Sequence, residues 1–343
     1  MGRLPDLRAR MKVCMVTPAP PRSLTGNRVT ALRWARLLGQ LGHRVTVVEE
    51  YDGQACDLMV ALHGRKSAAS IERLAEEKPG TPIVLALTGT DLYRDARTCA
   101  TTKLSLRLAA AIIVLQPEAL REVPDWARGR ARAIVQSAEP VHAQPPRRDA
   151  FEVAVLAHLR PVKDPFRAAM AARLLPARSR VRVLHAGATL DPDLDERARS
   201  EESSNPRYRW LGEMPRWRAL RVMARSRLLV ITSRSEGGAN VLSEALASGV
   251  PVLSSRIPGS TGVLGGDYPG LFAVGDTHGL AALFERAESD AEFRGTLTTW
   301  CRRLAPLVEP ARERKAWREL LRDCVRPGHR PAARAGSRRR GRA

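Results

Sequence analysis

Short apolar, β-branched runs alternate with amphipathic stretches from Lys12 to Val135. Runs that are apolar throughout predict strands buried on both faces of a parallel sheet, and the stretches between them predict helices. The first helix is expected over Asn27–Leu41, and Gly42 is expected to end it. Its apolar face is predicted to carry Val29, Leu32, Leu38 and Leu41. The strands predicted in this half are Val13–Thr17, Val45–Val48, Leu58–Leu62, Ile83–Leu87, Ile112–Leu115 and Ala133–Val135.

The alternation stops at Glu139–Ala150, where prolines and the lack of periodicity predict a linker, and then it restarts. From His278 to Val325 the pattern predicts consecutive helices. Two halves of alternating strands and helices predict two doubly wound sheets, which we expect to face one another across a ligand-binding cleft. The strands predicted in the second half are Val153–Leu156, Val181–Leu184, Arg209–Leu211, Leu228–Thr232 and Val252–Ser254. Helices are predicted after Pro165, Pro192, Pro215 and Ala239.

The size and composition of the chain agree with a two-domain intracellular protein. Its 343 residues suit two domains of about 150 residues each. It has no apolar run of about 20 residues that would span a membrane. The arginines near the N-terminus are not followed by the apolar segment of a secretory signal. The five cysteines are scattered and never form C-x-x-C, so we expect a reducing, cytoplasmic location and neither disulfides nor a zinc site.

The net charge of +21 could indicate a nucleic-acid or membrane-surface partner. Most of the positive residues are arginines spread among alanines, a distribution that fits coding bias. The dense run Arg326–Arg342 is predicted to be disordered, and it leaves a polyanion-binding role open. The aromatic content of 4 % and the lack of an RNA-stacking motif argue against nucleic acid as a partner. No stable membrane association is expected.

The strongest chemical signal is the segment S-R-S-E-G-G-A-N-V-L-S-E-A-L-A-S-G-V-P-V-L. It follows a predicted strand and begins a helix, so the amides of Gly237, Gly238 and Ala239 are expected at a helix N-terminus, which favours anions. Glu236 and Glu244 could hold the hydroxyls at two ends of one ligand, a sugar and a ribose. The alternative is an ordinary capped surface helix after a glycine turn.

Two further turns carry cations. In H-L-R-P-V-K-D-P, Arg160 and Lys163 follow a strand and could neutralise a diphosphate leaving group, although both could also be plain loop cations. In A-L-H-G-R-K-S-A-A-S, three potential cations lie between a strand end and a helix start, an arrangement that suits a compact anion. A solvated turn is the alternative there. The three residues are His63, Arg65 and Lys66.

The E-x7-E segment resembles that of glycosyltransferase family 4, whose members have the α/β GT-B fold and use nucleotide sugars. The resemblance implies that Glu236 and the amides of Gly237–Asn240 face the sugar and diphosphate, and that Glu244 holds the ribose. It also implies a last helix, at about Glu309–Val325, that crosses back to the first domain. Family members commonly carry an Arg–Lys pair where Arg160 and Lys163 stand, with the arginine more often at the position of His158. The predicted ranges are a disordered extension at 1–10, a first domain at 11–145, a second at 150–308, the crossing helix at 309–325 and a disordered tail at 326–343.

Two turns of the first half resemble family features on the acceptor side. T-G-N-R is similar to the glycine-containing loop beside the phosphates and acceptor, which gives Gly26, Asn27 and Arg28 as candidates. L-T-G-T-D-L-Y-R-D resembles the H-G-x-D turn, with Thr88 in place of the histidine. Asp91, with Thr90 beside it, is a candidate to touch the sugar, although an aspartate in a turn often only caps the backbone.

Taken together, these motifs resemble the selenosugar synthases of selenoneine biosynthesis, which join a UDP-activated glucose or N-acetylglucosamine to selenium from selenophosphate. No His–Asp pair in the first half announces itself as a general base, so an already anionic nucleophile fits better than an alcohol. We therefore expect UDP-sugar and selenophosphate as substrates, with no metal or other cofactor. Alternatives are an alcohol or thiol acceptor, a nucleotide-sugar epimerase or phosphorylase, and a polyanion-binding protein with a decayed site.

Overall fold

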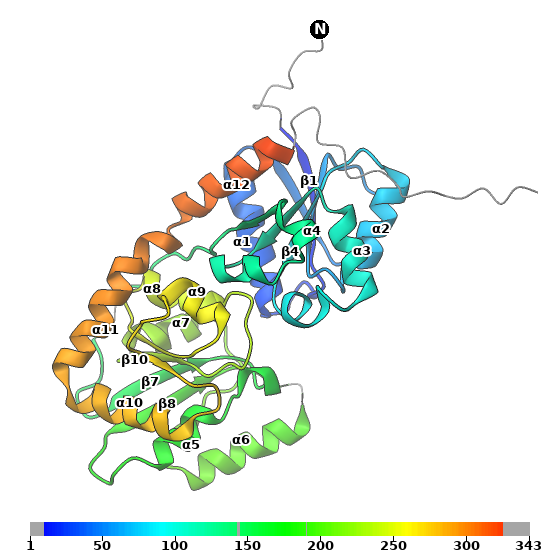
Figure 1. Ribbon diagram of the computed structural model, residues 1–343. Coiled ribbons are helices and arrows are strands. Elements are labelled where there is room, and N and C mark those ends of the chain that lie inside the picture. The colour runs from blue at the N-terminus through cyan, green and yellow to red at the C-terminus, as the bar shows by residue number, and fades with distance from the viewer. Residues whose placement is uncertain (1–9, 143–144, 190, 325–343) are drawn as a thin grey trace, which may run out of the picture. The chain divides into compact units, whose positions relative to one another are not determined.

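The computed structural model describes residues 10–142, 145–189 and 191–324 (Figure 1). The chain groups into two compact units. Of the described residues, the first unit contains 10–114, 120–132 and 314–324. The second contains Leu115–Ala119 and Ala133–Glu313. Most of the predicted N-terminal extension, the whole basic tail and Val325 lie outside the described residues. The cleft expected between the halves stays a prediction.

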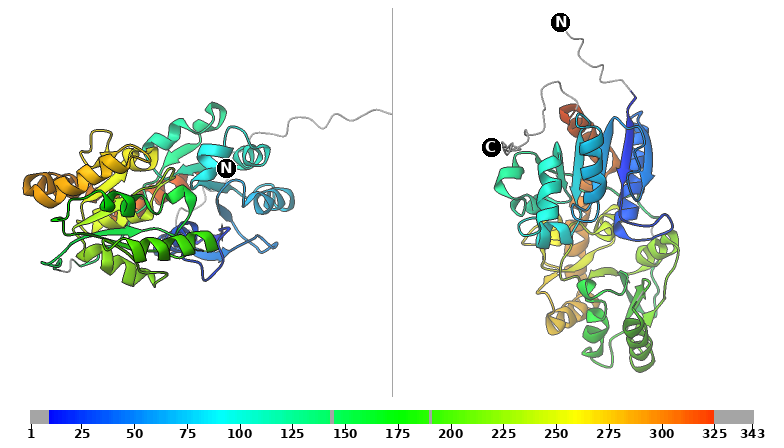
Figure 2. Two further views of the ribbon diagram at one scale, coloured as in Figure 1. Left: turned by 90° about the horizontal axis from the view of Figure 1, so that it is seen from below. Right: turned by 90° about the vertical axis from the view of Figure 1, so that its right-hand side faces the viewer.

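The first unit is built on a six-stranded parallel sheet of order β2-β1-β3-β4-β5-β6. The chain moves one way from β1 to β2 and the other way from β3 to β5. Right-handed crossovers therefore put α1 on one face of the sheet and α2 and α3 on the other (Figures 1 and 2). The strands are β1 (Lys12–Val16), β2 (Arg44–Val48), β3 (Leu58–Leu62), β4 (Ile83–Leu87), β5 (Ala111–Val114) and β6 (Ala131–Ala133). The helices are α1 (Gly26–Gln40), α2 (Ala68–Glu77), α3 (Ala100–Leu108) and α4 (Asp125–Arg128), with short helical turns at Asp91–Asp95 and Pro117–Arg121.

The last helix, α12 (Pro310–Cys324), begins in the second unit, and its part from Arg314 on belongs to the first unit and packs on α1. The rings of Trp34 and Trp317 are both fully buried and meet edge to face, with their centroids 4.9 Å apart. This contact anchors the C-terminal part of α12 to the first unit, as the predicted crossing helix requires.

Two predictions for the first unit are wrong. Leu32 was expected on the buried face of α1 but is 49 % exposed, because the face that packs inward carries Ala31, Trp34, Leu37 and Leu38. The last strand was expected at Ala133–Val135 but lies at Ala131–Ala133. This strand is at the sheet edge, where backbone pairing that begins with Ile112 N–H to the Arg130 carbonyl sets the register. The apolar residues on which the prediction relied come after this strand in the sequence.

The second unit has a six-stranded parallel sheet of order β12-β11-β10-β7-β8-β9. The sequence did not predict the short edge strand β12 or the helix α9. Figure 1 shows α8 and α9 on one side of this sheet and α5 and α6 on the other. The strands are β7 (Phe151–Leu156), β8 (Val181–Ala186), β9 (Tyr208–Trp210), β10 (Leu228–Ile231), β11 (Val252–Ser255) and β12 (Leu271–Phe272). The helices are α5 (Arg167–Arg173), α6 (Pro192–Ser204), α7 (Arg216–Arg225), α8 (Asn240–Ala247), α9 (Pro258–Leu264), α10 (Thr277–Ser289) and α11 (Ala291–Leu304).

No helix among the described residues is long and apolar enough to cross a membrane. The fold is α/β with two doubly wound parallel sheets, as the alternation of strands and helices predicted.

Candidate active site

The topology of the second unit brings its two charged motifs together. The order β12-β11-β10-β7-β8-β9 reverses between β10 and β7, and ligands of doubly wound sheets bind at such a switch point, beyond the carboxyl ends of the strands. The turn His158–Asp164 follows β7, and Thr232–Glu236 follows β10. Both motifs therefore lie at the position where the sheet leaves room for a ligand.

Lys163 and Glu236 form an ion pair at this switch point. The Lys163 ammonium donates to Glu236 Oε1, and the Ser233 hydroxyl donates to the same oxygen over 2.6 Å. The side chains of Lys163 and Glu236 are 25 % and 12 % exposed, so both stay within reach of a ligand. The sequence predicted a role for each charge but neither their pairing nor the contact with Ser233.

The turn after β7 is fastened to the end of β10. The Thr232 hydroxyl contacts the carbonyl oxygens of Lys163 at 2.9 Å and Asp164 at 3.0 Å. The Arg234 N–H donates to the Val162 carbonyl over 2.8 Å. Asp164 has a positive φ of 46°, an unusual conformation for a residue other than glycine. These bonds hold in place the backbone from which the Lys163 side chain extends.

The glycine turn leads directly into α8, as predicted. Ala239 precedes the helix and has no side chain that could cap its first amides. Gly238 has a packing role besides the predicted one, because a Cβ there would lie 2.6 Å from the Cβ of Leu115. Ala239 and the Gly237 backbone are buried, whereas Gly238 and Asn240 are half-buried.

Glu244, the predicted ribose ligand, is buried on α8 and forms an ion pair with Arg216 at the start of α7. Arg216 itself is half-exposed. Sequence reasoning missed Arg216, and the M-P-R-W-R segment carries no spacing signal that points to it. A nucleotide at Glu244 would therefore meet a carboxylate that already has a cation beside it.

The two other polar groups of the β7 turn differ from one another. The Arg160 side chain is exposed and makes no hydrogen bond or ion pair within the described residues, so it is available to an anion. The His158 ring accepts a hydrogen bond from the Ala188 N–H through Nδ1, over 3.1 Å. His158 is thus tied to the backbone, and Arg160 remains the candidate cation.

A buried histidine on strand β8 contacts the backbone at the end of β7. His185 Nε2 lies 2.9 Å from the Ala157 carbonyl, and Nδ1 lies 2.9 Å from the Tyr208 hydroxyl. Burial lowers the pKa of His185 to about 4, so the ring stays neutral near pH 7. The sequence did not single out this residue, because it stands within an otherwise apolar strand.

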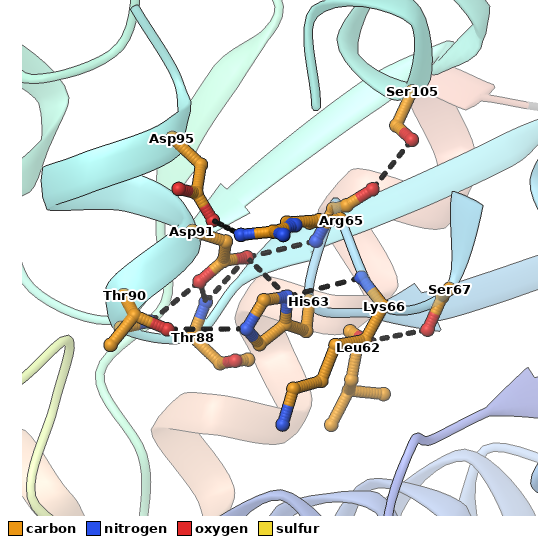
Figure 3. Close-up of polar contacts among 12 residues, drawn as sticks. Leu62, His63, Arg65, Lys66, Ser67, Thr88, Thr90, Asp91, Asp95 and Ser105 are labelled. Carbon is orange, nitrogen blue, oxygen red and sulfur yellow. Dashed lines mark hydrogen bonds and ion pairs between the residues drawn. The ribbon is translucent and has the colours of Figure 1, made fainter. Parts of the chain in front are cut away.

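In the first unit, Asp91 is the centre of a hydrogen-bond network that joins two turns (Figure 3). Its fully buried carboxylate accepts from the N–H groups of Gly64 at 2.9 Å, Thr88 at 3.0 Å and Gly89 at 2.8 Å. The bond to Gly64 ties the turn after β3 to the turn after β4. The structure thus corrects the first interpretation of Asp91 as a sugar contact and favours the alternative, a backbone cap.

His63 is held beside Asp91 (Figure 3). The residue is buried with a φ of 73°, Nδ1 accepts from the Lys66 N–H over 3.3 Å, and Nε2 lies 3.2 Å from the Thr90 hydroxyl. The same Nδ1 is 3.9 Å from the Asp91 carboxylate. His63 is therefore buried, unlike Arg65 and Lys66, and it lies beside Asp91, a contact that the sequence did not reveal. Its role in holding an anion stays a prediction.

Arg65 and Lys66 remain as exposed cations on this turn. Arg65 is 62 % exposed, and its guanidinium lies 4.0 Å from Asp95, a weak surface pair. Figure 3 shows the Lys66 side chain directed away from Asp91. The turn itself is rigid, because the Ser105 hydroxyl donates to the Gly64 carbonyl and the Ser67 hydroxyl to the Leu62 carbonyl, both over 2.6 Å.

The third candidate turn lies after β1, which adjoins β3 at the switch point of the first sheet. Here α1 begins at Gly26, and Thr25 makes no side-chain cap. Gly26 is exposed, whereas Asn27 and Arg28 are half-buried. The turns after β1 and β3 thus share one end of the sheet, which fits a site for a small ligand in this unit. Across the described residues, no group of three potential ligands is placed to hold a metal ion.

Comparisons with known proteins agree with this architecture. Residues 139–299 match the family model described as glycosyl transferases group 1. Anabaena Alr3699/HepE in complex with UDP-glucose is 16 % identical and has a TM-score of 0.73, covering 91 % of this chain and 100 % of that chain. Sucrose-phosphate synthase (tll1590) from Thermosynechococcus elongatus is 15 % identical with a TM-score of 0.71, covering 91 % and 98 %. No curated protein matches the sequence. The fold is thus that of GT-B glycosyltransferases.

Proposed function

We propose that the protein is a cytoplasmic glycosyltransferase that transfers N-acetylglucosamine or glucose from a UDP-sugar to selenophosphate. The observation that carries the donor half is the pair Lys163–Glu236 at the switch point, next to the start of α8. A cation and helix amides suit a diphosphate, and a carboxylate suits sugar hydroxyls. The pair lies in the segment that matches the glycosyltransferase model, and Alr3699/HepE, of the same fold, binds UDP-glucose.

On the donor side, Arg160 and Lys163 neutralise the diphosphate together with the amides of Gly237–Asn240. These groups can replace a metal at the leaving group, so we propose a metal-independent reaction. Glu236 accepts hydrogen bonds from the sugar, and Glu244 accepts them from the ribose. Because the Arg216 guanidinium already pairs with Glu244, we add Arg216 to the nucleotide-binding groups.

On the acceptor side, selenophosphate binds the turn after β3 through Arg65 and Lys66, with Arg28 and the start of α1 nearby in the same unit. Its selenium is already anionic and needs positioning and charge screening rather than a base. The selenium lone pair forms the bond to the anomeric carbon while the bond from that carbon to the UDP oxygen breaks, and UDP leaves with the electron pair. Hydrolysis of the selenium–phosphorus bond by water then gives the selenosugar and phosphate.

The proposal is tested by mass spectrometry of the products from UDP-N-acetylglucosamine and from UDP-glucose with selenophosphate. A product that contains both hexose and selenium is expected. Arg65→Ala and Lys66→Ala should each raise the KM for selenophosphate about tenfold, which corresponds to ~1.4 kcal/mol. Arg44→Ala is the control, since this exposed residue begins strand β2 at the opposite end of the sheet. An unchanged KM in both turn variants would remove this acceptor site from the proposal.

The His63–Asp91 pair favours a second candidate, transfer to an alcohol or thiol. If a proton moved to Nδ1, this nitrogen would give up its bond from the Lys66 N–H and face Asp91. Nε2 could then accept a proton from an acceptor hydroxyl in the position of the Thr90 hydroxyl. This candidate predicts UDP release with an alcohol panel and no selenophosphate, and a large loss of that release in His63→Gln.

A further inference from the structure

The carboxylate of Glu236 is held through one of its two oxygens. Lys163 and Ser233 both donate to Oε1. Within the described residues, Oε2 makes no hydrogen bond, although the side chain is 12 % exposed and so open to a ligand. Two donors on one oxygen fix the rotation of a carboxylate and leave the lone pairs of the other oxygen pointing in a defined direction.

Ser233 is itself held in place. It is buried, and the Ser255 hydroxyl from β11 donates to its carbonyl over 2.6 Å. Gly259 on α9 closes the loop from another side, because a Cβ there would lie only 2.3 Å from the Glu236 carbonyl oxygen. The segment that carries Ser233 and Glu236 is therefore confined by a side chain of β11 and by the backbone of α9.

We propose that Ser233 is a positioning residue, which together with Lys163 fixes Glu236 Oε1 so that Oε2 accepts a hydroxyl of the donor sugar. This inference rests on the proposed donor site. An ammonium has three N–H donors, so Lys163 can keep its bond to Glu236 while it contacts the diphosphate. Ser233 contributes one hydrogen bond and has no need to touch the substrate. Its effect is therefore specific to the sugar part of the donor.

The test compares UDP with UDP-sugar, because UDP lacks the group that Glu236 would hold. Calorimetric titrations of wild type and Ser233→Ala should show UDP affinity unchanged within about twofold, while the extra affinity for UDP-sugar falls about tenfold. A kinetic assay should show that turnover per bound donor also falls about tenfold. A tenfold loss is the worth of one charge-assisted hydrogen bond. Ser203→Ala on α6 is the matched control, since among the described residues its hydroxyl bonds only to the Ser200 carbonyl of its own helix.

A second pair of variants separates positioning from folding. Ser233→Thr keeps the hydroxyl and Ser233→Val has nearly the same shape without it, so any packing change is common to both. The proposal is supported if Ser233→Thr still binds UDP-sugar more tightly than UDP and Ser233→Val loses this difference. An equal loss of UDP and UDP-sugar affinity in Ser233→Ala overturns it. The same affinity difference between UDP and UDP-sugar in Ser233→Thr and Ser233→Val also overturns it. If wild type bound no UDP at all, the proposed donor site itself would fail instead.

Discussion

Gly259 lies at the start of α9 with no room for a side chain. An alanine Cβ there would approach the Glu236 carbonyl oxygen to 2.3 Å, the Glu236 Cβ to 2.8 Å and the Glu236 carbonyl carbon to 3.0 Å. Two of these atoms are backbone, so the contact cannot be relieved by rotation of a side chain. Overpacking of this kind costs about 1–3 kcal/mol of stability. Because ordinary carbon contacts are about 3.5–4 Å, Glu236 must shift by roughly 1 Å.

If Glu236 holds the donor sugar as proposed, a shift of about 1 Å lowers the rate on the order of 100-fold, so Gly259→Ala should lose both stability and kcat/KM for the UDP-sugar. Urea unfolding and steady-state kinetics measure the two effects. The matched control is Gly295→Ala: this exposed glycine lies inside α11 with nothing within 4 Å of an added Cβ. Removing a helix glycine there should raise stability by about 0.5–1 kcal/mol. Stability changes of the same sign in Gly259→Ala and Gly295→Ala, or unchanged turnover in Gly259→Ala, would refute the reasoning.

Two further predictions concern stability. His185 has a folded-state pKa lowered to about 4, so the unfolded chain takes up a proton first as the pH falls; stability is therefore full above pH 6.5 and decreases by about 3 kcal/mol between pH 6.5 and 4. Urea midpoints across this range should show that decrease in wild type and its loss in His185→Phe. Trp317→Ala should destabilise the protein by about 3–5 kcal/mol. Trp317→Phe should stay within ~1 kcal/mol of wild type, because the buried Trp317 Nε1 has no hydrogen-bond partner within the described residues. A Phe variant as unstable as the Ala variant would contradict this explanation.

The sequence predicted strands well where they are buried on both faces. Leu58–Leu62 and Ile83–Leu87 are apolar at every position and were located to the residue. The edge strand Ala131–Ala133 and the two-residue strand Leu271–Phe272 were misplaced or missed, because their strand conformation comes from pairing with a neighbour. The misjudged face of α1 has a similar cause, since the Trp34 contact with α12 depends on a helix far along the chain.

The donor motifs were recognisable because each is a continuous segment at a strand end. What could not be predicted is how their charges pair. Lys163 and Glu236 are 73 residues apart, and Arg216 and Glu244 are 28 apart, so only the sheet order brings each pair together. Both predicted ligand carboxylates form an ion pair with a cation, Glu236 with Lys163 and Glu244 with Arg216.

The acceptor turn was harder to interpret, because equal-looking residues differ in backbone conformation. The positive φ of His63 turns its ring inward to Asp91, while Arg65 and Lys66, two and three residues later, are exposed. The sequence, which shows three basic residues in one turn, could not distinguish the buried histidine from the two exposed cations. The consequence bears on chemistry: the turn offers two cations suited to an anionic nucleophile and, beneath them, an imidazole next to a buried carboxylate. Under the two proposals, selenophosphate would use the exposed cations and an alcohol would use the imidazole, so the charge of the acceptor separates them.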